Sequence, residues 1–238
     1  MRRIFVIICV LISTLSFSQD KVELLNKGNE YFQEGDFEKA EEYYKISLEV
    51  DNQYYKANLN TGHSLFRQAF SLIQKQDTTG LKKCSESELF YKNSVELTEN
   101  KNNKSECLYN LGNSQLLSKK LEESIESYKK SLRLVPENMN AKHNLSLAQY
   151  LLNKKQKNQE NQKDSKEDKK EQEHKEEEEK KDQSQENKQK DQAEEKKEAL
   201  SKEEIEQILN ALEREEKEVQ EDLQKKKIIG GNKLLKDW

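Results

Sequence analysis

The sequence predicts an all-α protein in which pairs of helices stack into a repeat array. The clearest evidence is the stretch 105–136, where apolar and small residues have the spacing of two helices that pack together. The same spacing recurs upstream, and one such pair cannot bury its apolar face alone. We therefore expect a helical-hairpin solenoid of three helix pairs and a capping helix. A charged linker and a C-terminal amphipathic helix complete the expected chain.

The best defined repeat unit spans residues 105–138. Its first helix carries Leu108, Leu111, Gly112 and Gln115. Its second helix carries Ser124, Tyr128 and Ser131, and Pro136 ends the unit. A glycine in mid-helix costs about 1 kcal/mol relative to alanine, so Gly112 needs a compensating role. We expect that the missing side chain lets Tyr128 lie across the first helix.

Two further copies precede this unit. Residues 21–54 place Gly28 and Tyr44 at the same offsets. In residues 55–101, Gly62 has the offset of Gly112, but Tyr91 lies about thirteen residues further along the chain than the offset of Tyr128 predicts. We assign the delay to an insertion at 70–85, with a turn over Asp77-Thr78-Thr79-Gly80. Residues 139–152 form one more first helix without a partner, which is typical of a capping helix.

These offsets resemble the tetratricopeptide repeat (TPR), a unit of ~34 residues with Leu-Gly, small, aromatic and Pro positions in this order. The resemblance implies a TPR domain over residues 19–152 that acts as a protein-binding scaffold. An irregular helical bundle is the alternative, but Gly or Ser at one position in four registers disfavours it.

The N-terminus has the three parts of a secretory signal peptide. Arg2 and Arg3 precede an apolar run over residues 4–12, and small residues follow at Ser16 and Ser18. We expect cleavage after residue 18 and export of the mature chain, without a membrane span once the signal is removed. Retention of the signal as an anchor is the alternative, although the run is short for a bilayer.

Residues 153–200 are almost entirely charged or amide residues and read as a solvated linker, disordered or partly helical. Structure resumes in the tail, residues 201–238, where Ser201 and Glu204 form a capping box. An apolar stripe follows at helical spacing and consists of Ile205, Ile208, Leu209, Leu212, Val219 and Leu223. A partner, a second copy or the chain's own array could cover it. We expect a partner, with Trp238 as a separate anchor.

One row of polar residues recurs on the first helices. In a TPR array the row faces the concave groove, and it consists of Asn26, Asn60, Asn110 and Asn144, with Asn29, His63 and Asn113 three residues after the first three. A side-chain amide can both donate to and accept from the backbone of an extended peptide. Peptide binding and simple repeat consensus both remain open. The clamp that some TPR domains use for a C-terminal carboxylate is not expected, because its cation positions are occupied by Leu25, Glu106 and Asn110. Only Asn29 and Asn60 fit its pattern.

Composition and motifs disfavour other function classes. Asp and Glu (46) outnumber Lys and Arg (42), so nothing indicates nucleic-acid binding. No metal-ligand spacing, nucleophile and base set or phosphate loop is present, so we expect neither enzyme activity nor a metal or other cofactor. Cys84 and Cys107 survive signal cleavage and could pair in an oxidising compartment, or remain free.

The exported array, the charged linker and the terminal Lys236-Asp237-Trp238 together resemble BatC, the TPR component of the Bacteroides aerotolerance (Bat) system. The resemblance implies a periplasmic adaptor that associates with the inner membrane through partners. Those partners are membrane-anchored proteins with von Willebrand A domains, in a system linked to oxygen or stress tolerance. A periplasmic chaperone-like holder of extended polypeptides is the alternative function.

Overall fold

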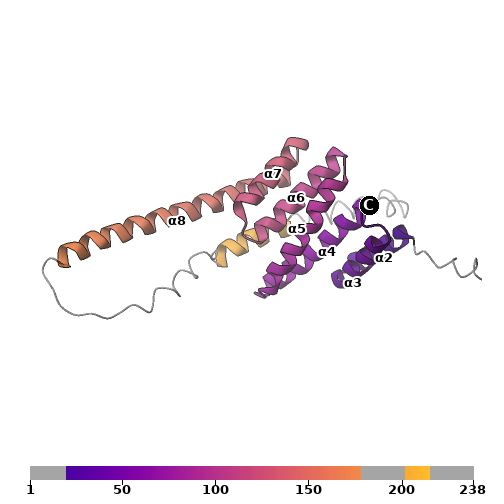
Figure 1. Cartoon of the computed structure of the whole chain (residues 1–238), viewed down its shortest axis with the longest axis horizontal. Helices are drawn as coiled ribbons and strands as arrows, with labels where there is room; N and C mark the ends of the chain where they lie inside the picture. The colour runs from indigo at the N-terminus through magenta and orange to yellow at the C-terminus, as the bar shows by residue number, and fades with distance from the viewer. Residues whose placement is uncertain (1–19, 178–201, 215–238) are drawn as a thin grey trace, which may run out of the picture.

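The computed structural model describes residues 20–177 and 202–214, and every regular element in these ranges is an α-helix. The expected all-α fold is therefore confirmed. Figure 1 shows α2 to α7 stacked side by side, with α8 projecting from the array. The helices are α2 (Lys21–Glu34), α3 (Phe37–Val50), α4 (Tyr55–Gln74), α5 (Thr79–Leu97), α6 (Lys101–Leu117), α7 (Leu121–Leu134) and α8 (Met139–Glu177). A further helix, the tail helix, covers residues 202–214 (yellow in Figure 1).

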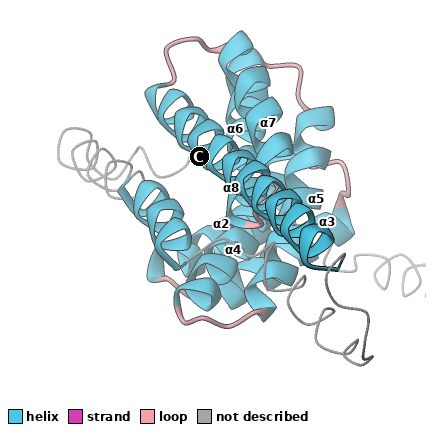
Figure 2. Cartoon of the chain, turned by 90° about the vertical axis from the view of Figure 1, so that its left-hand side faces the viewer, coloured by secondary structure: helices cyan, strands magenta, loops and turns pink. Residues whose placement is uncertain are grey.

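Consecutive helices pair into three hairpins, and α8 packs on α7. The first hairpin turns at Gly35, whose φ of 82° lies in the left-handed region that favours glycine. The Asp36 carboxylate then accepts a hydrogen bond from the backbone N–H of Lys39 and caps α3. Figure 2 shows the short loops that join the helices. These turns and caps fix where each helix begins and ends.

Three mid-helix glycines let the two helices of each hairpin approach closely. A Cβ added to Gly112 would lie 2.6 Å from the Tyr128 ring, and one added to Gly28 would lie 2.5 Å from the Tyr44 ring. Gly62 has the same relation to Tyr91, at 2.8 Å. No real Cβ contact is this short, so the role expected for Gly112 is confirmed and extends to all three hairpins.

The second hairpin corrects the predicted turn. Its helices have 20 and 19 residues, against 14 each in the first hairpin, so the insertion lengthens both helices. The chain turns before Thr79, where Gln76 has a φ of 61°. Gly80 lies inside α5, where an added Cβ would be 2.9 Å from the carbonyl oxygen of Ala69. This glycine therefore permits a close helix crossing and does not form the turn.

The capping helix also runs further than expected. The sequence placed its end near residue 152, but α8 continues to Glu177, through the first half of the charged linker. The predicted signal peptide and the end of the tail, which includes Val219, Leu223 and Trp238, lie outside the described residues.

The core divides into three apolar clusters. One joins α2, α3 and α4 around Tyr44, and a second joins α4, α5 and α6 around Tyr91. The third and largest contains Tyr128 and extends from α4 to α8. Ile208 and Leu212 of the tail helix belong to this third cluster. The tail helix is therefore part of the fold of the array.

Candidate functional site

The row of polar residues predicted to bind a peptide lies along α2, α4, α6 and α8, the first helices of successive units. Each of these helices contacts the next one in the series. Neighbouring units join at three places, which we name the first (α2 with α4), middle (α4 with α6) and last (α6 with α8) junctions. Side chains of the row are hydrogen-bonded to each other at the first and last of these. The three junctions differ in how completely their polar groups are satisfied.

At the first junction, Asn29 accepts two hydrogen bonds. The buried Tyr44 hydroxyl donates to Asn29 Oδ1 at 2.8 Å, and Asn60 Nδ2 donates to the same oxygen at 2.9 Å. Burial without this acceptor would penalise the tyrosine hydroxyl. Asn29 and Asn60 therefore join α2, α3 and α4, while Asn26, one turn earlier, is exposed.

The last junction repeats this arrangement in a buried form. Asn113 Oδ1 accepts from the Tyr128 hydroxyl at 2.8 Å and from Asn144 Nδ2 at 3.0 Å. Asn144 Nδ2 also lies 3.2 Å from the Tyr109 hydroxyl. Asn113 and Asn144 are 3% and 1% exposed, so they do not face a peptide. Their assignment to the groove is corrected, because the row's offset says nothing about which amides the protein itself satisfies.

The middle junction is open. Nδ1 of His63 lies 3.0 Å from the Tyr91 hydroxyl, so His63 replaces the asparagine found at the other junctions. Asn110 occupies the position of Asn60 and Asn144. Within the described part of the chain its amide makes no hydrogen bond, and it is partly exposed. The amide of Asn110 therefore has its full donor and acceptor capacity available.

Two titratable groups belong to the middle junction, His63, which is partly exposed, and Glu106, which is exposed. Burial lowers the pKa of His63 to about 4, so its imidazole is neutral at physiological pH. Glu106, one turn before Asn110, is exposed, yet desolvation raises the pKa of its carboxyl. The junction offers the hydrogen-bonding amide of Asn110 and the carboxylate of Glu106. The Glu106 carboxylate would repel the C-terminal carboxylate of a ligand.

Two buried glutamates, Glu41 and Glu88, join adjacent repeats, and neither was expected from the sequence. Glu41 accepts from Gln68 at 2.7 Å and from Lys83 at 3.1 Å. Burial alone would raise the pKa of Glu41, but hydrogen bonds from Lys45, Gln68 and Lys83 lower it. The recurrence of Ala40-Glu41 and Ser87-Glu88 at equivalent offsets is the signal that could have revealed these residues.

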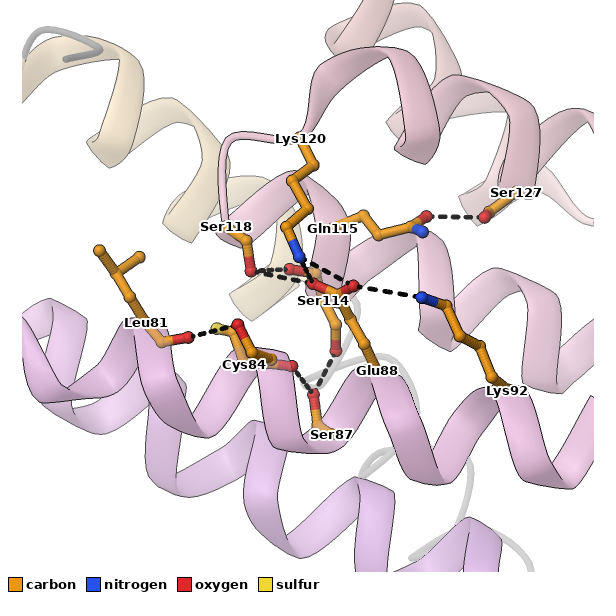
Figure 3. A network of polar contacts seen from close by, with 11 residues as sticks. Leu81, Cys84, Ser87, Glu88, Lys92, Ser114, Gln115, Ser118, Lys120 and Ser127 are labelled. Atoms are coloured by element: carbon orange, nitrogen blue, oxygen red, sulfur yellow. Dashed lines mark hydrogen bonds and ion pairs between the residues drawn. The ribbon is translucent and has the colours of Figure 1, made fainter. Parts of the chain in front are cut away.

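Glu88 has the same role in the next repeat (Figure 3). Lys120 Nζ lies 2.8 Å from one carboxylate oxygen of Glu88 and 3.0 Å from the other. Lys92, one turn later on α5, lies 3.8 Å away, and the neighbouring Ser87 shares a hydrogen bond of 2.7 Å with Ser114. Each glutamate is satisfied by charged or polar partners, so these residues hold the array together and are not free acids.

Cys84 and Cys107, the cysteines of the described residues, are free and buried in different clusters. Cys84 packs in the third cluster, and Cys107 Sγ lies 3.6 Å from the Tyr55 hydroxyl. Burial raises the pKa of both thiols to about 12, so neither is a reactive thiolate. They are packing residues in this structure.

The tail helix packs on the array through its apolar face. Ile208 and Leu212 are 1% and 3% exposed, and Leu209 is partly buried against the same cluster. Ile205 is half-buried. Oε1 of the buried Glu204 lies 3.0 Å from Nζ of Lys154 on α8.

This packing corrects the expectation that a partner covers the first half of the stripe. The chain's own array covers it, which was one of the three alternatives, beside a partner protein and a second copy of the chain. The sequence showed that Ile208 and Leu212 need a cover, but periodicity along one helix does not say which surface supplies it. A partner could reach these residues only after the tail helix leaves.

Among residues 20–177 and 202–214, no group of His, Cys, Asp and Glu could hold a metal ion. None of the helices described there combines the length and the hydropathy needed to span a bilayer.

Comparison with known proteins identifies the repeats. Two tetratricopeptide repeat family models match, one at residues 22–54 and the other at residues 105–138. These segments are the first and third hairpins, and the elongated second hairpin lies between them. No protein of curated function matches the chain.

Two solved structures are similar to part of the chain. The first TPR of Spaghetti (RPAP3) bound to the HSP90 peptide SRMEEVD is 25% identical, with a TM-score of 0.48 over 57% of this chain and 94% of that one. The first TPR domain of human RPAP3 is 23% identical, with a TM-score of 0.48 over 58% and 95%. By the family-model matches, residues 22–54 and 105–138 are tetratricopeptide repeats, and they form the first and third helical hairpins.

Proposed function

We propose that this chain is a non-enzymatic adaptor that holds a partner protein at the middle junction of its TPR array. The observation that carries the proposal is Asn110, a partly exposed amide whose equivalents Asn60 and Asn144 are hydrogen-bonded within the protein. An amide in this state can bind the backbone of an extended segment, whose N–H and C=O groups need partners. The same junction also holds a neutral imidazole, His63 of α4, and an acidic group, Glu106, one turn before Asn110 on α6.

The cellular setting that we propose is a cell-envelope complex of the Bat type. The support is the three-part N-terminus, residues 1–18, and the resemblance of the whole layout, including Lys236-Asp237-Trp238, to BatC. In this setting the mature protein is periplasmic and reaches the inner membrane through partners with von Willebrand A domains. Oxygen or stress tolerance is the process that such a complex serves.

Co-purification tests the adaptor function. Full-length tagged protein is isolated from detergent-solubilised membranes, and the bound proteins are identified and quantified. We expect one stoichiometric membrane protein with a von Willebrand A domain. A broad set of unfolded clients would instead support the chaperone-like holder, and no bound protein would contradict both functions.

N-terminal sequencing tests export separately. We expect the purified mature protein to begin at Gln19 and to fractionate with the periplasm. Retention of Met1 in a membrane-integral form would contradict export by a cleaved signal.

A further inference from the structure

The two faces of the tail helix differ in residue type and in burial. Its buried face carries Glu204, then Ile208 four residues later and Leu212 four residues after that. Residues at this spacing share one face of an α-helix. The other face, with Glu206 and Asn210, is exposed to solvent.

The tail helix shares the third apolar cluster with α4 to α8, and Glu204 of the tail helix pairs with a cation of α8. α6 supplies Tyr109 and Leu116 to the cluster, and α8 supplies Ala148 and Leu151. Lys154 lies one turn beyond this apolar part of α8 and pairs with Glu204 at 3.0 Å. Apolar contact provides most of the affinity of such a surface, and the lysine selects an acidic residue at one end of the ligand.

The tail helix depends on this surface for its own stability. A helix as short as residues 202–214 is marginal in water, and most helical stability comes from packing an apolar face. A segment of this kind loses most of its helical stability when it leaves its site.

The segment between α8 and the tail helix is long enough for the tail helix to bind the array of its own chain. From Lys154 to the end of α8 the helix extends ~35 Å. The chain between residues 177 and 202 has a maximum reach of ~80 Å, which exceeds that distance. Tethering raises the effective concentration of the tail at its site to roughly the millimolar range, so an added ligand must compete with it.

We propose that the apolar surface of the third cluster, with Lys154 of α8 at its edge, is a binding site for amphipathic helices that carry an acidic residue one turn before an Ile and Leu stripe. Residues 202–214 are its resident ligand. A partner helix of the same pattern replaces them. This site is separate from the middle junction, and a partner that bound both would engage the array at two places.

Binding of a fluorescent peptide of residues 200–216 to the full-length protein tests the site. In the double variant Ile208→Asp/Leu212→Asp the chain's own tail is released, because two charges replace its buried side chains. We expect this variant to bind the wild-type peptide at least roughly tenfold more tightly than the parent protein does, since no tethered competitor remains. The exposed substitution Asn210→Asp is the matched control and leaves peptide binding as in the parent. Equal, weak binding by the parent and the released variant would overturn the proposal.

A charge exchange tests the role of Lys154 and does not depend on that double variant. Lys154→Glu in the full-length protein places a carboxylate opposite Glu204 and is expected to weaken tail docking roughly tenfold. A peptide carrying Glu204→Lys should then bind this variant better than the wild-type peptide does. Lys157→Glu, an exposed change on the same helix, should not reverse the preference. If Lys154→Glu and Lys157→Glu behave alike, the ion pair does not select the ligand.

These readouts use the chain's own peptide, so they are independent of the co-purification experiment. Loss of the membrane partner with intact peptide binding would reject the adaptor complex and keep this site. The opposite result would reject this site and keep the adaptor.

Discussion

The first and last junctions of the array are closed, whereas the middle junction is open. At the closed junctions a tyrosine hydroxyl and a neighbouring amide both donate to one asparagine oxygen, that of Asn29 or Asn113. At the middle junction His63 contacts Tyr91, and Asn110 has no partner in the described residues. The same repeat position therefore serves stability at the outer junctions and is available for binding at the middle one.

The largest effect is expected from breaking a closed junction. Asn113→Ala removes the acceptor of the Tyr128 hydroxyl and of the Asn144 amide, and both remain buried. We expect a loss of about 2–4 kcal/mol in the free energy of unfolding, measured by urea denaturation. A loss below about 1 kcal/mol would mean that the closed junction does not stabilise the array.

The histidine of the middle junction should make stability depend on pH. The pKa of His63 is about 4 in the folded protein, against 6.5 for a free histidine. Above pH 6.5 the imidazole is neutral in both states, and as the pH falls towards 4 the unfolded state binds a proton first. Stability should therefore fall over this range.

His63→Asn, which copies the asparagine of the closed junctions, isolates this contribution. His63 is partly exposed, so we expect the parent to lose on the order of 1 kcal/mol more than the variant between pH 7.5 and pH 5. Urea unfolding of both proteins at the two pH values measures the difference, and other titrating groups cancel. Parallel pH profiles would contradict the lowered pKa of His63 in the folded protein.

A smaller effect on stability is expected from two serines next to the junctions, Ser64 and Ser114, because only one of them has a hydrogen-bond partner. Ser64 is fully buried and is the single buried side-chain polar group in the described ranges without a hydrogen bond. Its equivalent Ser114 pairs with Ser87, but the residue equivalent to Ser87 is Ala40, which has no hydroxyl. Ser64→Ala should therefore stabilise the protein by about 0.5–1 kcal/mol.

The matched control is Ser114→Ala, which removes the Ser87 contact and should destabilise by about 1 kcal/mol. Thermal or urea unfolding measures both variants. Changes of the same sign would show that the two serines are not distinguished by their hydrogen bonds.

The repeat array was predictable because its signals are local. Helical spacing and a mid-helix glycine are visible along one segment, and Gly112 correctly predicted the close approach of Tyr128. Gly80 was misassigned to a turn because glycine serves turns and close helix crossings equally well. Only the packing of α4 against α5 distinguishes the two roles.

The sequence predicted which residues belong to the site, but not which of their amides are already buried and hydrogen-bonded within the protein. The offsets placed Asn110 and Asn113 in one row, yet one is available and the other is buried. That difference depends on side chains from other helices, such as Tyr128, whose hydroxyl the sequence analysis did not connect to the row. In the same way, the stripe of the tail helix was visible, while the surface that covers it arises only in three dimensions.

The most direct test of the account is the affinity of Asn110→Ala for the membrane partner isolated by co-purification. Because the amide has no partner within the described residues, the free energy of unfolding should change by less than about 0.5 kcal/mol. Partner affinity should fall at least roughly tenfold, which corresponds to the loss of hydrogen bonds to the ligand. Asn102→Ala, an exposed change on the same helix, is the control and should leave both quantities unchanged. Unchanged affinity in Asn110→Ala would contradict the central claim that the open middle junction binds the partner.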